Sequence, residues 1–436
     1  MRLARLPVGP ARRGLSVGKR LSLAFGDALR WPGLGRREVL AQSYASALLE
    51  EQDGRHKDIW LDDVLARLDS SAKVEQVNSA AFLEQRRHAI RPADLTTELM
   101  DAVCSVLLRA RPVRAAESAA REMVTLLQAE FGDEAPDEAS VARTLSVFHW
   151  KRRLWSVLLA RIAPRVVLVA DPGEFGLIAA ARTRGASVVE IQHGIIDRYN
   201  PSYSWPASAL PHRDALTIPD LLFVHGEHWH VELAGTGFGG ERLRVVGNPR
   251  VDLYRDARDR RRAGANRLLV FTSQGVAVDD AAAALAQCAR AAQRRMPLDI
   301  TVKLHPVYDH DSRVYASHLS GLPNVRIVAA NEAPSTFALL AEADLHASIS
   351  SATHYDAIAL GVPTVVLPLA GHETVAPLVA AGHASVAADG EALCALATGP
   401  ALPALHRSIA EYYCKPGAAD NMLRELASLL DRPQSR

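Results

Sequence analysis

Two short apolar runs decide the fold class: Pro164-Arg-Val-Val-Leu-Val-Ala-Asp171 and Ala186-Ser-Val-Val-Glu-Ile-Gln192. Continuous apolar runs of this length are typical of strands that are buried on both faces of a sheet. The residues between them, 175–184, have helical periodicity. We therefore expect a strand–helix–strand unit with parallel strands, and the segments 220–225 and 243–247 continue the alternation.

Five further strand-like segments follow in the second half of the chain, and helical segments separate them. They are residues 267–272, 299–304, 324–329, 343–348 and 363–368. Alternation of this kind predicts a parallel sheet covered by helices on both faces. The expected fold is α/β, with two such domains in tandem and a cleft between them. A ligand is expected in that cleft, because open α/β sheets bind ligands at the carboxyl ends of their strands.

The rest of the chain completes a five-part organisation. We predict a basic N-terminal arm (1–40), a helical N-terminal region without clear strands (41–160), a first Rossmann-like domain (161–262), a second Rossmann-like domain (263–400) and C-terminal helices that cross back to the first domain (401–436). The arm is interpreted as a disordered, solvated tail, and contact of its arginines with an anionic membrane surface is the alternative. The charged stretch 252–262 is interpreted as a solvated linker or helix flank.

Composition and charge exclude several classes of protein. The chain has 436 residues, of which 48% are apolar and 23% charged, as in folded globular domains. Its formal net charge of +1 gives no overall attraction to nucleic acid. The four cysteines stand far apart, and no apolar stretch of the sequence reaches the length of a membrane-spanning helix. We expect a cytoplasmic protein with reduced thiols, and a peripheral position at the inner face of the membrane is the alternative.

Polar residues follow the first two predicted strands. Gln192-His193-Gly194 ends the second strand, where a neutral imidazole could act as a base and Gly194 permits a tight turn. Asp171 and Glu174 follow the first strand and are the next candidates for a catalytic base. The structural alternatives are a satisfied histidine, a helix N-cap at Asp171 and a first-turn acid at Glu174.

Three polar clusters end strands of the second predicted sheet. They contain Ser273 and Gln274, then Lys303 and His305, and then Ser350, Ser351, Thr353 and Asp356. Hydroxyl, amide, cationic and imidazole groups at one sheet edge are suited to binding a phosphate. Each group also has a structural alternative, as a solvated lysine, a turn-capping imidazole or a helix N-cap. The coincidence of these groups at one edge is what predicts a phosphate site.

A metal site is not predicted. Asp309-His-Asp311 has a D-x-D form that could hold a divalent cation beside a diphosphate. An aspartate just after Pro306 is also a natural helix opener, and this interpretation is favoured. We therefore expect no metal and no cofactor.

Several of these motifs, in this order, resemble a known family. The strings are Val188-Val-Glu-Ile-Gln-His-Gly-Ile195, Val246-Gly-Asn-Pro-Arg-Val-Asp252, Thr272-Ser-Gln274, Lys303-Leu-His-Pro306, and Ser350-Ser351 through Gly361-Val-Pro363. Together they resemble bacterial surface-polysaccharide glycosyltransferases of the GT-B fold. This family includes capsule-type Kdo and sialic acid transferases and the glycerophosphotransferases of teichoic-acid synthesis. The resemblance covers about residues 160–425.

The resemblance implies a GT-B-like α/β fold, with two Rossmann-like domains facing a cleft. In this fold the second domain (263–400) would hold the activated donor nucleotide and the first (161–262) the acceptor. The residues that it places around the donor phosphates are Lys303, His305, Ser350, Ser351 and Thr353. Many relatives carry Glu where this chain has Asp356, and the shorter carboxylate leaves ribose binding at this position open. GT-B enzymes typically need no metal.

The function that follows is transfer of a sugar or polyol phosphate from a nucleotide-activated donor to a surface-polysaccharide or glycolipid acceptor. In inverting transfer, His193, or else Asp171 or Glu174, would deprotonate the acceptor hydroxyl. Gln192 and Gly194 would lie on the acceptor side. A nucleotide-sugar 2-epimerase is the first alternative, and a non-catalytic polysaccharide-assembly protein is the second. The oligomeric state does not follow from the sequence.

Overall fold

The computed structural model describes most of the chain. The described residues are 15–45, 48–50, 54–77, 82–111, 113–171, 173–260, 266–305, 308–309, 311–330, 332–402 and 405–432. They form two compact units. The N-terminal unit contains the described residues before His225, residues 230–246 and the described residues after Ala418. The C-terminal unit contains residues 225–229 and the described part of 247–418.

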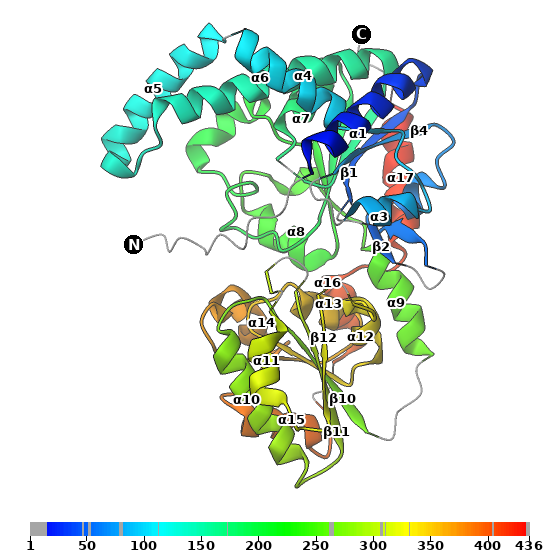
Figure 1. Cartoon of the computed structure of the whole chain (residues 1–436), viewed down its shortest axis with the longest axis vertical. Helices are drawn as coiled ribbons and strands as arrows, with labels where there is room; N and C mark the ends of the chain where they lie inside the picture. The colour runs from blue at the N-terminus through cyan, green and yellow to red at the C-terminus, as the bar shows by residue number, and fades with distance from the viewer. Residues whose placement is uncertain are drawn as a thin grey trace. The chain divides into compact units, whose positions relative to one another are not determined.

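Seven parallel strands form the sheet of the N-terminal unit (Figure 1). In spatial order they are β5 (Leu95–Thr96), β4 (Ser71–Gln76), β1 (Val39–Tyr44), β6 (Val166–Val169), β7 (Ser187–Ile191), β8 (Leu221–Val224) and β9 (Leu243–Val245). Counted along the chain, β1 is the first strand and β6 the fourth, and the direction in which the sheet grows reverses between them. α/β sheets bind ligands at such a switch point, because the loops after the two strands lead away to opposite sides.

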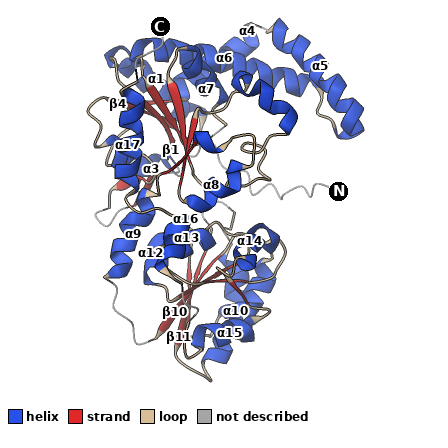
Figure 2. Cartoon of the chain, turned by 180° about the vertical axis from the view of Figure 1, so that it is seen from behind, coloured by secondary structure: helices blue, strands red, loops and turns tan. Residues whose placement is uncertain are grey.

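Helices cover both faces of this sheet (Figure 2). One face packs on α6 (Glu138–Ile162) and α7 (Phe175–Thr183), and the other on α2 (Asp62–Leu65) and α17 (Ala418–Leu430). The unit also contains α1 (Val17–Arg30), α3 (Phe82–Arg87), α4 (Glu98–Ala110), α5 (Arg114–Phe131) and the antiparallel pair β2 (Leu48–Glu50) and β3 (His56–Asp58). Because helices lie on both faces, the central strands β6 and β7 need apolar side chains on both sides.

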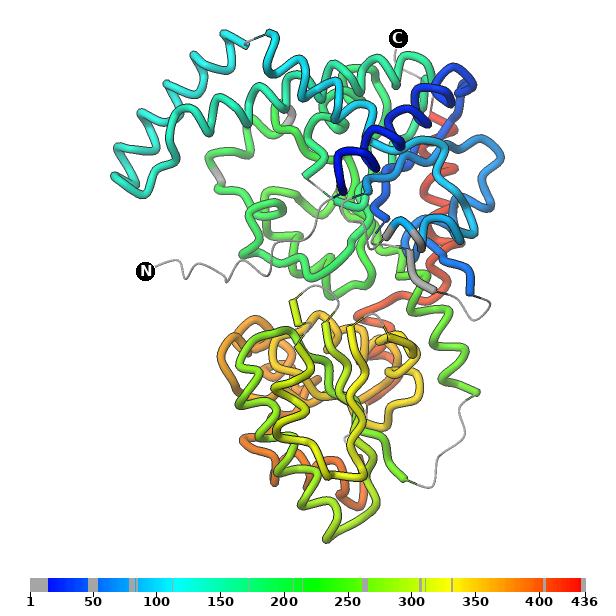
Figure 3. The backbone as a smooth tube through the Cα atoms, in the orientation of Figure 1, coloured from blue at the N-terminus to red at the C-terminus, as the bar shows by residue number. Residues whose placement is uncertain are grey.

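The last described helix returns to the first strand of the chain. Met422, Leu426 and Leu429 of α17 share one core with Val39 and Ala41 of β1. Figure 3 shows this C-terminal segment beside N-terminal segments of the same unit. Of the predicted C-terminal helices, the structure thus places α17 in the N-terminal unit, whereas α16 (Arg407–Tyr413) lies in the C-terminal unit.

Six parallel strands form the sheet of the C-terminal unit. In spatial order they are β12 (Val325–Val328), β11 (Leu298–Lys303), β10 (Arg267–Thr272), β13 (Leu345–Ser348), β14 (Thr364–Val366) and β15 (Ser385–Val386). Counted along the chain, this order is 3-2-1-4-5-6, and it reverses between β10 and β13. The carboxyl ends of these two strands are therefore the switch point of this sheet.

Two cores flank the C-terminal sheet. One contains side chains of α10 (Val278–Ala292), α11 (Ser312–Leu319) and α15 (Gly390–Thr398), and the other contains side chains of α9 (Pro249–Asp259), α12 (Thr336–Glu342) and α13 (Thr353–Ala359). The short helix α14 (Ala376–Ala380) belongs to the same unit, and α8 (Glu227–Ala234) has residues in both units. The layered arrangement leaves the strand ends, rather than the sheet faces, available for a site.

The prediction of two parallel α/β sheets is confirmed. All nine predicted strands are present, with bounds within two residues of those expected. The prediction of a helical region without strands over residues 41–160 is wrong. β4 and β5 lie within it, and together with β1 they form one edge of the N-terminal sheet. The sheet therefore begins well before residue 161.

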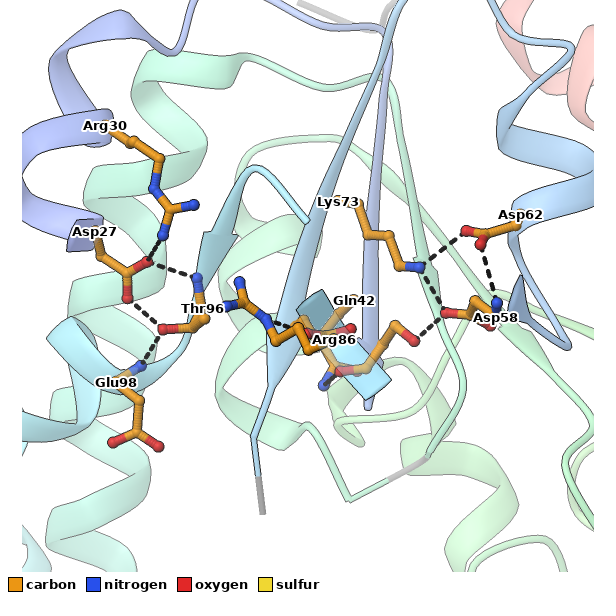
Figure 4. Close-up of polar contacts among 11 residues, drawn as sticks. Asp27, Arg30, Gln42, Asp58, Asp62, Lys73, Arg86, Thr96 and Glu98 are labelled. Atoms are coloured by element: carbon orange, nitrogen blue, oxygen red, sulfur yellow. Dashed lines mark hydrogen bonds and ion pairs between the residues drawn. The ribbon is translucent and has the colours of Figure 1, made fainter. Parts of the chain in front are cut away.

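Buried ion pairs explain why β4 escaped the sequence analysis (Figure 4). The strand reads Ser-Ala-Lys-Val-Glu-Gln, which is not a continuous apolar run. Lys73 Nζ lies 3.0 Å from Asp58 Oδ2 and 2.9 Å from Asp62 Oδ1, and Glu75 pairs with Arg86. Because the charges are neutralised by partners inside the unit, a strand with two charged residues can still be buried.

Part of the predicted N-terminal arm is an ordered helix, so the expectation of a disordered tail is wrong for residues 17–30. α1 begins at a Ser16 cap, whose Oγ accepts the Lys19 N–H at 3.4 Å. Residues 1–14 of the arm lie outside the described residues. Among the described helices, none combines the length and the apolar character that crossing a membrane requires.

Of the two interpretations of the charged stretch 252–262, the structure contradicts the solvated linker and agrees with a helix. Most of residues 252–262 belong to α9, and two of its arginines are half-buried against the C-terminal unit. Arg255 donates to the carbonyls of Ala359 and Cys414, and Arg258 donates to the carbonyl of Ala343. The two guanidinium groups thus bind buried carbonyls at the C-terminal ends of α12, α13 and α16, which a charge count along the sequence does not reveal.

Candidate functional site

The carboxyl ends of β10 and β13 are joined by side chains that the sequence analysis singled out. Ser350 donates from its backbone N and its Oγ to Gln274 Oε1, at 3.2 and 2.6 Å. Ser348 Oγ donates to the Thr272 carbonyl at 2.6 Å. The switch point of the C-terminal sheet therefore carries a compact group of hydroxyl and amide groups.

A second set of contacts ties the start of α13 to β10. Thr353 donates from its backbone N and its Oγ1 to Ser351 Oγ, at 3.2 and 2.6 Å. Thr353 Oγ1 also lies 2.7 Å from Thr272 Oγ1. The Ser351 side chain is buried and that of Thr353 half-buried. The structure thus brings together four predicted donor-site residues, Gln274, Ser350, Ser351 and Thr353, and we call them the switch-point cluster.

Ser273 and His305 contact each other between the ends of β10 and β11. The His305 backbone N–H donates to Ser273 Oγ at 3.2 Å, and His305 Nδ1 accepts the Tyr308 N–H at 3.1 Å. A neutral imidazole that accepts at Nδ1 carries its hydrogen on Nε2. The turn-capping role is therefore real, and the same geometry makes Nε2 the donor of this ring.

Gly275 shows how closely the loop after β10 approaches the segment after β11. Its φ is +70°, and a Cβ at this position would lie 2.2 Å from the Tyr308 carbonyl oxygen. A larger residue would push these two backbone segments apart. The glycine therefore allows Gln274 and His305 to stand at one sheet edge.

Lys303 has a different role from the predicted one. Its side chain is buried, and Nζ donates to the carbonyls of Ala329 and Glu332, at 2.9 and 2.5 Å. Burial lowers the pKa of Lys303, and the Glu332 carboxylate opposes this effect. The ammonium group holds the loop after β12, so it is neither a solvated strand-end lysine nor displayed with the switch-point cluster.

Asp356 lies on α13, one turn after Thr353. Burial raises the pKa of Asp356 to about 6, and the nearby Arg250 of α9 opposes this shift. The Arg250 guanidinium in turn stacks 3.9 Å from the centre of the Phe337 ring. These contacts connect Asp356 with α9, and ribose binding by this residue stays a prediction.

The sequence analysis missed two buried histidines near the switch-point cluster, His346 and His354. His346 of β13 approaches Thr272 Oγ1 with its Nε2, at 2.9 Å, and His354 of α13 approaches Thr364 Oγ1 with its Nδ1, at 2.6 Å. Both side chains are completely buried. The only signal in the sequence was a lone histidine within an otherwise apolar or small-residue segment, which seldom identifies a site.

Carboxylates gather at the switch point of the N-terminal sheet. Glu174, which precedes α7, accepts from Gln42 Nε2 at 3.3 Å and from Tyr44 Oη at 3.2 Å. Burial raises the pKa of Glu174, and Lys151 of α6 opposes this shift. Gln42 and Tyr44 were missed because they lie on β1, which the sequence analysis did not recognise as a strand.

Asp171 and His193 influence each other at the same sheet edge. Asp171 Oδ1 accepts the Gly173 N–H at 2.6 Å, which closes the turn after β6, and the N-cap of α7 is Glu174 rather than Asp171. The exposed His193 ring lies with its centre 6.3 Å from that of Trp60. Partial desolvation lowers the pKa of His193, and the Asp171 carboxylate opposes this effect. A neutral imidazole beside a carboxylate can accept a proton.

Gln192 and Gly194 shape the turn after β7. Gln192 is buried, and its Nε2 donates to the Gly194 carbonyl at 2.8 Å. Gly194 does not have a positive φ, and a Cβ on it would meet no described atom within 4 Å. Neither its φ nor its packing therefore requires a glycine at this position, and the acceptor-side role of both residues stays a prediction.

No metal centre is assembled within the described part of the chain, where no three His, Cys, Asp or Glu side chains are grouped to hold an ion. Asp311 of the D-x-D segment caps α11, since its Oδ1 accepts the Arg313 N–H at 3.0 Å. The helix-opener interpretation of Asp311 is thus confirmed. The four cysteines are free and buried.

The fold is similar to those of several solved enzymes, whereas no family model and no curated protein matches the sequence. The UDP-GlcNAc 2-epimerase from Neisseria meningitidis, bound to UDP-GlcNAc, is 15% identical with a TM-score of 0.54, and the match covers 89% of this chain and 99% of that one. The UDP-GlcNAc 2-epimerase from Methanocaldococcus jannaschii is 13% identical with a TM-score of 0.53, covering 89% and 99%. The UDP-N-acetylglucosamine 2-epimerase from Rickettsia bellii is 14% identical with a TM-score of 0.52, covering 91% and 98%.

At these identities the similarity shows the fold. The chain consists of two parallel-sheet α/β domains that resemble the GT-B fold. The match extends over nearly the whole length of the solved chains, so both sheets take part in it.

Proposed function

We propose that this protein is an enzyme that acts on a nucleotide sugar. The observation that carries the proposal is the switch-point cluster of Gln274, Ser350, Ser351 and Thr353 in the C-terminal unit. Hydroxyl groups at the carboxyl ends of parallel strands are suited to a diphosphate, because they can donate hydrogen bonds to its charged oxygens. The fold similarity to a UDP-GlcNAc 2-epimerase bound to UDP-GlcNAc supports the same ligand class.

The C-terminal unit would bind the leaving group. Cleavage of the bond between the sugar C1 and the diphosphate places negative charge on the departing oxygen. Donors such as His305 Nε2–H and the Ser351 hydroxyl would stabilise that charge more in the transition state than in the ground state. A single donor of this kind typically lowers a barrier by about 3–4 kcal/mol.

The N-terminal unit would supply acid–base chemistry. The lowered pKa of His193 keeps its imidazole neutral near pH 7, and Asp171 would stabilise the imidazolium after proton transfer. The raised pKa of Glu174 makes this carboxyl able to give up or take a proton closer to neutral pH. These three groups are therefore the candidates for removing or returning a proton on the substrate.

Two reactions fit this assignment. Nucleotide-sugar 2-epimerisation is the first candidate, supported by the fold similarity to UDP-GlcNAc 2-epimerases. It needs groups that remove and return a proton at the sugar C2. Glycosyl transfer to a polysaccharide or glycolipid acceptor is the second, supported by the resemblance of the segments 192–194 and 303–306 to those of polysaccharide transferases.

Incubation with UDP-N-acetylglucosamine alone in D₂O separates the two reactions. Epimerisation breaks a C–H bond, so proton NMR would show the 2-epimer and deuterium at C2 without any acceptor. A transferase would leave the sugar unchanged and release UDP only when an oligosaccharide acceptor is added. A thermal-shift screen with UDP, CDP, GDP and CMP tests the ligand class, and a wild-type protein that binds none of them would contradict the proposal.

A further inference from the structure

A continuous chain of hydrogen bonds runs from Ser351 into the core of the C-terminal unit. Its links are Ser351 Oγ to Thr353 Oγ1 (2.6 Å), Thr353 Oγ1 to Thr272 Oγ1 (2.7 Å), Thr272 Oγ1 to His346 Nε2 (2.9 Å), His346 Nδ1 to Thr364 Oγ1 (2.7 Å) and Thr364 Oγ1 to His354 Nδ1 (2.6 Å). None of the steps proposed above uses either histidine. His346 nevertheless contacts Thr272, and Thr272 contacts the Thr353 side chain that donates to Ser351.

Counting hydrogens gives this chain a direction. Each hydroxyl has one hydrogen to donate. Thr353 Oγ1 donates to Ser351 Oγ, which uses its only hydrogen. Thr272 must then donate to Thr353, because two hydroxyl oxygens 2.7 Å apart need a hydrogen between them. His346 must in turn donate to Thr272 from Nε2.

The same count fixes the hydrogens of the two histidines. Burial lowers the pKa of His354 to about 3 and that of His346 well below its usual value, so each ring is neutral with a single N–H. His346 with its hydrogen on Nε2 accepts at Nδ1 from the Thr364 hydroxyl. Thr364 then has no hydrogen left for His354, so His354 donates to it from Nδ1.

The opposite set of tautomers is less favourable. It would require Ser351 Oγ to donate to Thr353 Oγ1, whereas Thr353 Oγ1 is the donor and Ser351 Oγ the acceptor in this contact. The chain therefore runs from the histidines toward Ser351, and each hydrogen in it is used once.

The two serines of the loop differ in what they can offer a ligand. Ser350 Oγ spends its hydrogen on Gln274 Oε1. Ser351 Oγ accepts two hydrogen bonds from Thr353, so its own hydrogen is available to a group that is not part of this series of hydrogen bonds. A phosphate oxygen can only accept hydrogen bonds at neutral pH, so Ser351 rather than Ser350 matches it.

We propose that His346 is a positioning residue: through Thr272 and Thr353 it sets Ser351 as the hydroxyl that donates to a phosphate oxygen of the nucleotide. The identity of the ligand rests on the proposed function. The direction of the hydrogen-bond chain does not, since it follows from contacts within the C-terminal unit alone.

Histidine tautomers test the direction without any ligand. Long-range ¹H–¹⁵N correlation spectra of the ¹⁵N-labelled full chain distinguish Nε2–H from Nδ1–H rings, and the signals are assigned by their loss in His346→Gln and His354→Asn. The expected result at pH 7 is Nε2–H for His346 and Nδ1–H for His354. An Nδ1–H tautomer or an imidazolium for His346 would overturn the inference even if the protein binds nucleotides well.

Calorimetric titration with UDP tests the consequence for binding. Ser351→Ala is expected to weaken UDP binding about tenfold or more, as does loss of a hydrogen bond to a charged group. Ser350→Ala should weaken it less than Ser351→Ala does, because the hydrogen of the Ser350 hydroxyl is used by Gln274. Thr353→Val, which removes the hydroxyl at constant shape, should weaken binding severalfold, and Thr353→Ser should restore it. His346→Gln should weaken it in the same range as Thr353→Val.

The outcomes separate the two proposals. Failure of the wild-type protein to bind UDP or any other tested nucleotide would refute the proposed function. The histidine tautomers would then still test the direction of the hydrogen-bond chain. Wild-type binding with equal losses in Ser350→Ala and Ser351→Ala, or with no loss in Thr353→Val, would overturn the positioning role while the function stands. Circular dichroism spectra identify any variant that fails to fold. If one does, the comparison of Thr353→Val with Thr353→Ser still tests the positioning role.

Discussion

Lys73 carries a positive charge into the core of the N-terminal unit. Its Nζ lies within 3.0 Å of the carboxylates of Asp58 and Asp62, and none of the three side chains is more than 3% exposed. Burial by itself lowers the pKa of Lys73, but the two carboxylates outweigh this effect and raise it, so the amine stays charged. Asp58 also accepts hydrogen bonds from Ser43 Oγ and the Leu61 N–H. One ionic cluster thus connects β1, β3, β4 and the start of α2.

Replacing Lys73 with methionine should destabilise the protein strongly. The substitution leaves two buried carboxylates without their cation, and loss of one partner from a buried pair typically costs about 3–5 kcal/mol of unfolding free energy. Urea denaturation measures this loss. The control is Arg67→Ala, which removes an exposed pair with Asp420 at the surface and should cost about 1 kcal/mol or less. Equal losses in the two variants would refute the structural role of the cluster.

Glu190 should make the stability of the wild-type protein fall as pH rises. Burial raises its pKa to about 8, although a hydrogen bond from the Tyr203 hydroxyl opposes this shift. Between about pH 4.5 and 8 the unfolded chain loses this proton while the folded protein keeps it, so folding becomes less favourable with increasing pH. The contribution is fully present below about pH 4.5 and is lost as pH passes through 8.

The variant Glu190→Gln isolates this effect, because its amide cannot ionise. Relative to the wild type, the variant should gain stability steadily from pH 5 to pH 8. Urea denaturation midpoints of both proteins at several pH values measure the difference. A difference that does not change with pH would mean that Glu190 is ionised in the folded protein.

At the scale of elements, α1 presents an apolar face away from its unit. Val17, Leu21, Phe25 and Leu29 follow each other at four-residue spacing and are 60–73% exposed. The first 37 residues of the sequence contain nine Lys and Arg and a single acidic residue. Exposed apolar residues beside basic ones are typical of helices that lie on anionic membranes. Peripheral membrane contact stays a prediction, and the exposed apolar face of α1 is the surface expected to make it.

Vesicle sedimentation tests that prediction. The wild-type protein should sediment with vesicles that contain phosphatidylglycerol more than with neutral phosphatidylcholine vesicles, and added salt should release it. Phe25→Glu should abolish most of the binding. The matched control is Leu126→Glu on α5, which alters an equally exposed apolar residue of another helix. If both variants sediment like the wild type, α1 is not the contact surface.

A strand can be recognised from its sequence when its buried side chains are apolar. It is harder to recognise when buried charged side chains are paired with residues on other elements. β6 and β10 could be predicted because a continuous apolar run fills both faces of a central strand. β4 could not, because Lys73 and Glu75 are paired with residues on other elements, and a pattern along one segment does not contain its partners. The same limit applies to the candidate site. Ser350 and Ser351 were recognisable from the end of a strand, whereas the partners of Lys303 became known only from the fold.

For the whole molecule, the proposed division of labour predicts two classes of variant. His193→Gln, in the N-terminal unit, should lower kcat about 100-fold or more while UDP affinity stays at the wild-type value, because a general base acts on the reaction and not on the nucleotide. His305→Ala, in the C-terminal unit, should lower both turnover and UDP affinity, since it removes a donor to the phosphates. Steady-state kinetics and UDP titration of both variants measure the two effects. Loss of UDP affinity in His193→Gln would contradict the assignment.

The return of α17 to β1 has a consequence for synthesis of the chain. On the ribosome, Val39 and Ala41 emerge long before Met422 and Leu426, the side chains that cover them. The C-terminal unit is nearly continuous in sequence and can fold as soon as it is translated. Until α17 is translated, the face of the N-terminal sheet that it covers leaves its apolar side chains exposed to solvent. Nascent chains stalled before Ala418 would therefore be the ones that chaperones retain and proteases remove.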